Sequence, residues 1–387
     1  MASLFTLHSF CMDNLTHTLV GAALAETGLK RVTPLATPTL LIAANLPDID
    51  VVARGFGQLA FLHHHRGITH ALVGLPVLAA LLALIMWGGS RWLARQTGSP
   101  GARFGPLFGL SLLSIATHPL LDFTNAYGWR PFLPWSDRWF YGDIAFVIDI
   151  WIWAALGGAL FIATTRRSKP FTRRLSLTLW AVLFISTGVI IARFDGAGVG
   201  IKLLWFAMVA VAVACRWLFP INERQARRLS LGLLTAVLVY FGALTLVHRA
   251  ALDQISTMAQ AINNEQVTQI SALSMPASPL SWLALVTTDQ AFYLAELRLL
   301  SQPVSLNSAQ RMARATGAPS AILAAHRTAD GQSFLRFARF PASEAHEHGE
   351  QIEVVIRDLR FFPPSNLFTL RIRLDKNLHQ IAEPSSN

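Results

Sequence analysis

The stretch GPLFGLSLLSIATHPLL, residues 105–121, contains no acidic or basic side chain other than one histidine, His118, near its end. An α-helix needs roughly 17–25 predominantly apolar residues to cross the hydrocarbon core of a bilayer. The next residue is Asp122, so two ionisable side chains four positions apart close the stretch. It therefore predicts a membrane helix that carries reactive groups at one end.

Comparable apolar runs follow one another along the first two thirds of the chain. They occupy residues 71–87, 144–164, 175–193, 199–218 and 229–247. Two shorter apolar segments, 15–29 and 34–47, are of a length that suits short or re-entrant helices. The expected fold is mainly α, a polytopic membrane bundle of about eight helices, followed by a small β-rich soluble domain.

The composition excludes an ordinary soluble enzyme. Hydrophobic residues make up 53% of the chain, charged residues only 14%, and the mean hydropathy is +0.43. Soluble domains carry about 25% charged residues. The net charge of +10 lies in residues 1–249, with 21 basic and 10 acidic residues, whereas residues 250–387 have 11 and 12. Basic residues that flank apolar runs mark membrane topology, so nucleic acid is not the expected partner.

The basic residues gather in alternate loops of the apolar region. Loops 30–31, 88–104, 165–174 and 216–228 hold 14 of the 21. Lys and Arg are enriched on the cytoplasmic side of membrane proteins. This pattern predicts a multi-pass membrane protein with its N-terminus and C-terminal domain on the extracytoplasmic side.

After Leu246 the pattern changes to that of a soluble domain. Residues 250–275 are polar and compatible with a helix, and several later segments alternate apolar and polar residues as half-buried strands do. The expected strands are 281–288, 291–300, 333–340, 352–362 and 367–375. The predicted domains are a metal-site membrane domain (1–165), additional transmembrane helices (166–249) and an extracytoplasmic β-rich domain (250–387).

Histidines and acidic residues concentrate at the predicted outer ends of the membrane segments. They come from five separate stretches: His17, Asp48, Asp50, His63, His64, His65, His70, His118, Asp122, Asp143 and Asp149. Imidazole and carboxylate groups are the ligands of zinc and similar divalent metals. Ionisable groups in or just beneath a membrane are costly, which favours a function for them. The pattern predicts a metal site at this level.

The spacing of these residues supports one site. His118 and Asp122 are four apart and share a helix face. Pro47 ends a helix and places Asp48 and Asp50 in a turn. Asp149 lies about one turn inside an apolar run and needs a partner there.

Each of these residues also has a structural interpretation. His17 alone could bond to backbone at the interface, His63–His65 could be an exposed loop, and Asp48 and Asp50 could cap a helix. His118 with Asp122 could be a buried ion pair. Asp143 and Asp149 could cap a helix or form a structural pair. The HEH sequence at 346–348 fits a solvated loop.

Four segments resemble, in order and spacing, the YdjM-like family of inner-membrane proteins, described as metal-dependent hydrolases. They are DNLTHTLVGAALAE (13–26), NLPDID (45–50), HHRGITHALVG (64–74) and HPLLDFTNAYGWRPFLPWSDRWFYGDIAFVIDIWIW (118–153). The resemblance covers about residues 12–165 and implies a location in the bacterial cytoplasmic (inner) membrane. The C-terminal part looks like the soluble extension of the longer bacterial members. The family positions fall on His17, Asp48, Asp50, His65, Arg66, Gly67, Thr69, His70, His118, Asp122, Asn125 and Asp149.

Two departures from the family pattern are visible. Ala71 stands where the family often has Ser, and Ile150 stands where it often has Pro. Neither change removes a predicted ligand.

These observations predict a membrane-bound hydrolase that uses one or two divalent ions, Zn²⁺ or alternatively Mn²⁺, to cleave a phosphoester of a lipid or lipid-linked substrate. The predicted metal ligands are His17, Asp48, Asp50, His65, His70, His118, Asp122 and Asp149. Arg66 would bind an anionic substrate oxygen, or else anchor the chain to headgroups. Asp50 would act as a base, and Asn125 and Tyr127 would position the substrate.

Two other classes of function remain open at this point. A divalent-metal transporter would place its ligands near the middle of the bilayer. A non-catalytic scaffold would hold a closed, structural metal site, with a C-terminal domain that binds a protein partner.

Overall fold

The computed structural model describes residues 14–165, 170–194, 197–219, 221–301, 305–361 and 368–381. Contacts between Cα atoms divide the chain into two compact units. The first contains residues up to Ile49, Arg66–Leu246 and Ser274–Pro279, and the second contains Asp50–His65, Val247–Leu273 and the chain from Leu280 onward. The three domains predicted from the sequence stay a prediction.

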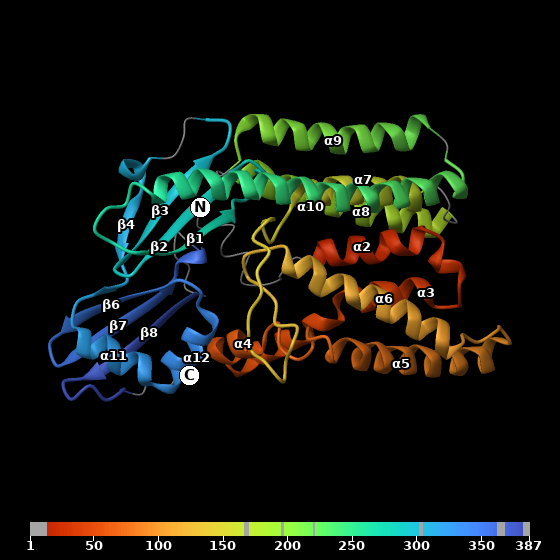
Figure 1. Cartoon of the computed structure of the whole chain (residues 1–387). Helices are drawn as coiled ribbons and strands as arrows, with labels where there is room; N and C mark the ends of the chain where they lie inside the picture. Colours follow the sequence, from red (N-terminus) through yellow and green to blue (C-terminus); the bar gives the residue numbers. More distant parts are fainter. Residues whose placement is uncertain are drawn as a thin grey trace. The chain divides into compact units, whose positions relative to one another are not determined.

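The first unit is helical (Figure 1). Its elements are α2 (Asn14–Glu26), η1 (Leu29–Arg31), α3 (Ala36–Asn45), α5 (Gly74–Thr97), α6 (Phe104–Phe123), α7 (Ile150–Thr165), α8 (Pro170–Arg193), α9 (Val199–Leu218) and α10 (Glu223–Ala259). The 3₁₀ segment η2 (Leu46–Phe56) begins in this unit, and α10 ends in the other one.

Five of these helices are long and apolar enough to cross a membrane: α5, α6, α8, α9 and α10. The prediction of a polytopic helical membrane protein is therefore confirmed. Helices α2 and α3 have only 13 and 10 residues, in agreement with the short segments expected there. Helix α7 is also shorter than its apolar run, because the Asp149 carboxylate accepts the N–H groups of Trp151 and Ile152 at 2.9 and 3.1 Å and so caps the helix at Ile150.

Short α2 is nevertheless a central element of the first unit. Leu19, Val20 and Ala23 are buried in one apolar cluster with α7 and α10. On its α3 side, a Cβ atom at Gly21 would lie 2.8 Å from the carbonyl oxygen of Leu40, so only glycine permits this close approach. Helix α3 in turn contacts α6, which contacts α5. This packing joins the elements that carry the predicted ligands.

The second unit contains two four-stranded sheets. One has the order β1 (Val267–Ser274), β2 (Ser281–Thr288), β3 (Ala291–Arg298), β4 (Gln310–Ala313), and the other β5 (Ala315–Thr316), β6 (Pro341–His348), β7 (Gln351–Asp358), β8 (Thr369–Asp375). The unit also holds α4 (Gln58–His64), η3 (Leu306–Ser308), α11 (Pro319–Arg327), α12 (Ala329–Phe337) and η4 (Leu359–Phe361). The predicted β-rich domain is thus confirmed.

Three local predictions in this unit were wrong. Most of segment 333–340 lies in α12 rather than in a strand, because Phe334 and Phe337 are buried three residues apart, as on a helix face, and Thr328 caps the helix. The polar stretch 250–275 is helical only to Ala259 and then forms β1. The HEH sequence ends strand β6 rather than forming a loop.

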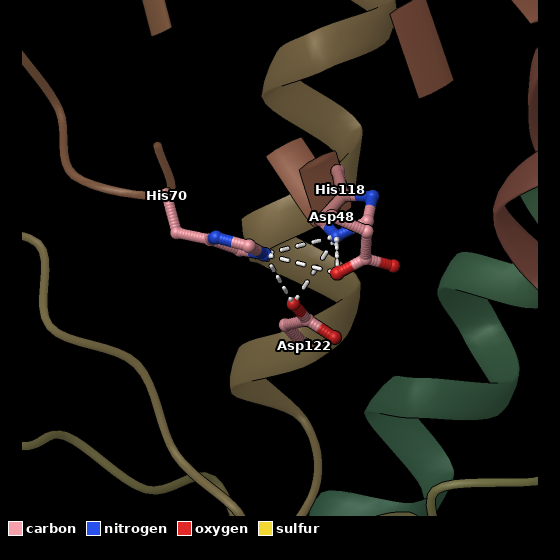
Figure 2. A group of neighbouring side chains, drawn as sticks. All are labelled: Asp48, His70, His118 and Asp122. Atoms are coloured by element: carbon pink, nitrogen blue, oxygen red, sulfur yellow. Dashed lines mark hydrogen bonds and ion pairs between the residues drawn. The ribbon is translucent and has the colours of Figure 1, made fainter. Parts of the chain in front are cut away.

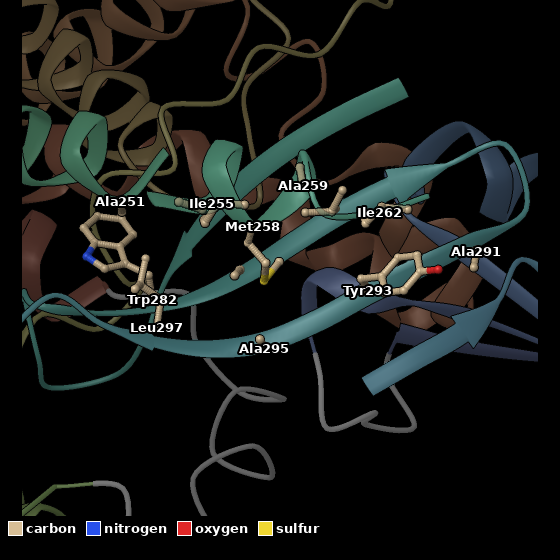
Figure 3. Close-up of a cluster of buried hydrophobic side chains, with 13 residues drawn as sticks. Ala251, Ile255, Met258, Ala259, Ile262, Trp282, Ala291, Tyr293, Ala295 and Leu297 are labelled. Carbon is tan, nitrogen blue, oxygen red and sulfur yellow. The ribbon is translucent and has the colours of Figure 1, made fainter. Parts of the chain in front are cut away.

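The core of the first sheet is built against the end of α10. Figure 3 shows Ala251, Ile255 and Met258 of this helix packed against Trp282 of β2 and Leu297 of β3. Trp282 and Ile255 are fully buried. The core of this sheet is therefore completed by the last turns of α10.

We expect Ile255→Ala to lower the free energy of unfolding by about 2–5 kcal/mol, because it leaves a cavity in this core. Thr257→Ala, at an exposed position of the same helix, is the matched control and should change it by about 0.5 kcal/mol or less. Denaturant unfolding of the full chain in detergent measures both. Equal effects of the two substitutions would contradict the assigned core.

Candidate metal centre

Four buried side chains from three segments form the centre of the first unit. Asp48 lies in the first turn of η2, and His70 lies in the turn that precedes α5. His118 and Asp122 lie one turn apart on the inner face of α6. Figure 2 shows that the four side chains converge, with His70 extending from the left of the view toward the other three.

Five of the six distances between their ligand atoms match the edges of one coordination tetrahedron, and all four atoms lie within 4.8 Å of one another. The two Nε2 atoms of His70 and His118 are 3.2 Å apart. Each Nε2 is 3.4 Å from Oδ1 of Asp48 and 3.4 Å from Oδ2 of Asp122. Zinc binds His nitrogen and carboxylate oxygen at about 2.0–2.2 Å, which gives tetrahedral edges of about 3.3–3.6 Å. The four atoms can therefore hold one divalent ion.

The other ring nitrogens of both histidines are occupied in a way that suits metal ligation. Nδ1–H of His118 donates to the carbonyl oxygen of Ala44 at 2.7 Å, which leaves Nε2 with its lone pair. Nδ1 of His70 lies 3.0 Å from Oγ1 of Thr69. The backbone carbonyl of His70 accepts a hydrogen bond from the indole N–H of Trp129 at 2.7 Å. Metal-bound histidines are usually oriented by hydrogen bonds of this kind.

The two carboxylates supply the negative charge that a cation needs. Oδ1 of Asp48 and Oδ2 of Asp122 are buried and accept no hydrogen bond of normal geometry from the described residues. Burial opposes ionisation of Asp48, but the imidazoles of His118 and His70 nevertheless hold its pKa below the ordinary value. Buried carboxylates without hydrogen bonds are costly unless a cation pairs with them. The donor set thus fits a divalent metal.

Arg66 orients one of these carboxylates. Its fully buried guanidinium donates to Oδ1 of Asp122 at 2.6 Å, and also to the carbonyls of Asp122 and Gly128 and to Oδ1 of Asn125. Its backbone has φ of 52°, a left-handed conformation that is uncommon for arginine. Strain of this kind is retained where the surroundings enforce it, often at functional sites. The predicted contact of Arg66 and Asn125 with substrate stays a prediction.

His17 and Asp149 lie beside the four ligand atoms rather than among them. The His17 ring stacks on His118 with centroids 3.7 Å apart, and its Nε2 is 3.7 Å from Oδ1 of Asp122. Asp149 caps α7 and accepts the hydroxyl of Tyr240 through Oδ2 at 2.9 Å. Metal ligation by either residue stays a prediction.

Asp50 and His65 form a second buried pair. Nδ1 of His65 lies 2.8 Å from Oδ1 of Asp50, and both residues belong to the segment that groups with the second unit. Their metal ligation, and the role of Asp50 as a base, stay predictions. His63 and His64 are exposed on α4.

A small cavity adjoins Asp122. It has a volume of about 20 Å³, and its lining residues include His17, Asp122, Asn125, Asp149 and, from α10, Phe241. A cavity of roughly 10–15 Å³ or more can hold one water molecule if polar partners are present. Sequence reasoning did not select Tyr240 or Phe241, because both lie in an apolar run that showed only a membrane span.

We expect the purified protein to contain a divalent metal, and His118→Ala to lose most of it because one of four ligands is removed. Elemental analysis of the detergent-solubilised protein measures the metal-to-protein ratio. His63→Ala, an exposed histidine outside the cluster, is the matched control and should keep the wild-type ratio. A wild-type ratio in His118→Ala would disprove the ligand set.

Comparisons with known proteins agree with this picture. No solved structure matches the chain. One relative, the uncharacterized protein YfhP of Bacillus subtilis (strain 168), is 27% identical over 138 residues, which cover 33% of this chain and 39% of that protein. The chain thus spans well under half the length of this curated relative. The resemblance predicted from the sequence is confirmed, because residues 12–197, which include all four ligand residues, match the family described as YdjM inner membrane protein.

Proposed function

We propose that this protein is a membrane-bound, metal-dependent hydrolase that cleaves a phosphoester of a lipid or a lipid-linked molecule. The observation that carries the proposal is the set of four buried ligand atoms within 4.8 Å of one another, with the five distances that involve a histidine nitrogen at 3.2–3.4 Å. A divalent ion, Zn²⁺ or Mn²⁺, lowers the pKa of a coordinated water and polarises a phosphoryl oxygen when it is bound.

The residues of the chain would divide the remaining tasks. Asp48, His70, His118 and Asp122 would hold the ion. Arg66 would keep Asp122 in place through its 2.6 Å contact. Because these groups are buried, their charges act in a medium that screens them little, which strengthens their effect on a reacting phosphoryl group.

The cavity beside Asp122 supports water as the attacking group. Its size suits one water molecule. Nδ1 of His17, one of its lining residues, is buried and has no hydrogen-bond partner among the described residues. A water in the cavity could satisfy this nitrogen, and His17 or Asp149 could take up its proton.

The outer face of α6 supports a substrate with apolar chains. Leu120 is 59% exposed, and Phe123 is also exposed, on the same helical turn that carries His118 and Asp122. In a membrane protein such side chains face lipid. Trp135, 78% exposed in the segment between α6 and α7, is a residue type that favours the headgroup region. These exposed side chains, on the turn that carries two ligand residues and in the following segment, favour a lipid or lipid-linked substrate.

A structural metal site is the second candidate, and one observation favours it. Four protein ligands already complete a tetrahedron, whereas catalytic zinc sites keep a position open. In that case the protein would be a scaffold, and it would bind metal without hydrolysing any ester.

Hydrolysis should separate the two candidates. We expect the protein to hydrolyse phospholipids or polyprenyl phosphates in mixed micelles, with release of free phosphate from a monoester or of a phosphomonoester and an alcohol from a diester. His118→Ala should reduce the rate by about 100-fold or more, because several kcal/mol of transition-state stabilisation depend on the ion. A chelator should have the same effect, and His63→Ala should not. Bound metal without release from any member of the panel would favour the scaffold.

The charge pattern gives a prediction of orientation. With 14 of 21 basic residues in alternate loops, we expect the C-terminal domain outside the cytoplasm, so a C-terminal alkaline-phosphatase fusion should be active. A fusion at the same position to a reporter that works only in the cytoplasm should be inactive. The opposite pair of results would reverse the proposed topology.

A further inference from the structure

The cavity beside Asp122 has walls from two parts of the chain. His17, Asp122, Asn125 and Asp149 belong to the residues that match the YdjM family, 12–197. Phe241 belongs to α10, which lies outside the matched residues. The preceding residue, Tyr240, donates its hydroxyl to Oδ2 of Asp149 at 2.9 Å. Helix α10 therefore supplies one residue of the cavity lining, Phe241, and one hydrogen bond to Asp149, from Tyr240. The other residues named here belong to the part of the chain that matches the family.

The wall is held in place by apolar packing. Val237, one turn before Phe241, is buried in a cluster with Leu19 and Val20 of α2 and Leu156 of α7. Phe241 packs against the same cluster. Interiors packed in this way yield little to a larger guest. Phe241 is therefore held in place beside this cavity of about 20 Å³.

We infer that Phe241 restricts the acceptor of the reaction to water, and that Tyr240 is a positioning residue that holds Asp149 at the cavity. The inference rests on the proposed hydrolase function. In hydrolysis the oxygen of water forms the new bond to phosphorus, the ester P–O bond breaks, and the proton of water ends on the leaving alcohol. An alcohol acceptor would form the same bond and transfer its proton in the same way, which would give a new ester instead of free phosphate. Phe241 would exclude that acceptor by size.

The size argument gives a direction and a magnitude. Replacement of Phe241 by alanine removes a ring from the cavity wall and leaves space that the neighbouring helices fill only in part. A pocket discriminates against one extra carbon by about 10–200-fold. We therefore expect Phe241→Ala to admit molecules of a few heavy atoms that the wild type excludes.

A binding experiment without turnover tests whether Phe241 limits the size of molecules that enter the cavity. The full-length protein in detergent is loaded with Co²⁺, whose visible absorption reports on its ligands, and titrated with acetate as a small probe. We expect little spectral change for the wild type and an apparent acetate affinity at least about tenfold higher for Phe241→Ala. Leu238→Ala, a 71% exposed position on the same helix, is the matched control and should behave as wild type.

The same variants test the choice of acceptor during turnover. In the presence of methanol, Phe241→Ala should form methyl phosphate at a ratio to free phosphate at least about tenfold above that of the wild type. Tyr240→Phe should leave this ratio and the metal content unchanged but lower kcat with little change in KM. Tyr293→Phe is the matched control, because it removes a similar tyrosine–carboxylate contact (3.0 Å to Glu265) in the other unit. It should change neither kcat nor the product ratio.

The outcomes separate the inference from the proposed function. Equal responses of the wild type and Phe241→Ala to acetate, whether both bind or both exclude it, would overturn the role of Phe241. The acetate titration does not require catalysis. It therefore tests the role of Phe241 even if the protein has no hydrolase activity. If Phe241→Ala does not fold with a normal Co²⁺ content, Phe241→Leu replaces it, with the same direction expected.

Discussion

The burial of two carboxylates against two imidazoles is the central constraint on the first, helical unit. Asp48 and Asp122 are buried, and Nε2 of both His70 and His118 lies 3.4 Å from an oxygen of each carboxylate. Such an arrangement is stable only if positive charge compensates it. Arg66 supplies part of that charge to Asp122, and a divalent ion between the four ligand atoms would supply the rest.

The surrounding helices are arranged so that these groups stay in place. Close contact at Gly21 joins α2 to α3, and α3 supplies the Ala44 carbonyl that orients His118. Short helices serve this purpose well, since α2 and α3 are buried against their neighbours and need not span a bilayer on their own. The long apolar helices provide the membrane anchorage, and α10 adds Tyr240 to the edge of the site.

Much of the fold was predictable because membrane helices and paired strands have strong local patterns. The run at 105–121 became α6, and the strand expected at 281–288 was observed with those bounds. Prediction failed where the local sequence pattern favours one secondary structure and the contacts in the folded chain favour another. The segment around Phe334 alternates like a strand, yet Thr328 starts a helix there. Tyr240 could not be selected, because a tyrosine in an apolar run gives no sign of the carboxylate it will meet.

Hydropathy and residue chemistry are local properties, so the chain alone already indicated a helical membrane protein with imidazole and carboxylate groups as candidate metal ligands. These local properties could not separate ligands from the other candidates, since His17, His65, His70 and His118 look alike along the chain. The folded structure shows that Nε2 of His70 and of His118 lies 3.4 Å from oxygens of both Asp48 and Asp122, that His17 stacks on His118, and that Asp149 caps a helix. The physical reason is that coordination depends on distances of about 3 Å between atoms, and those distances arise from the packing of helices far apart in sequence.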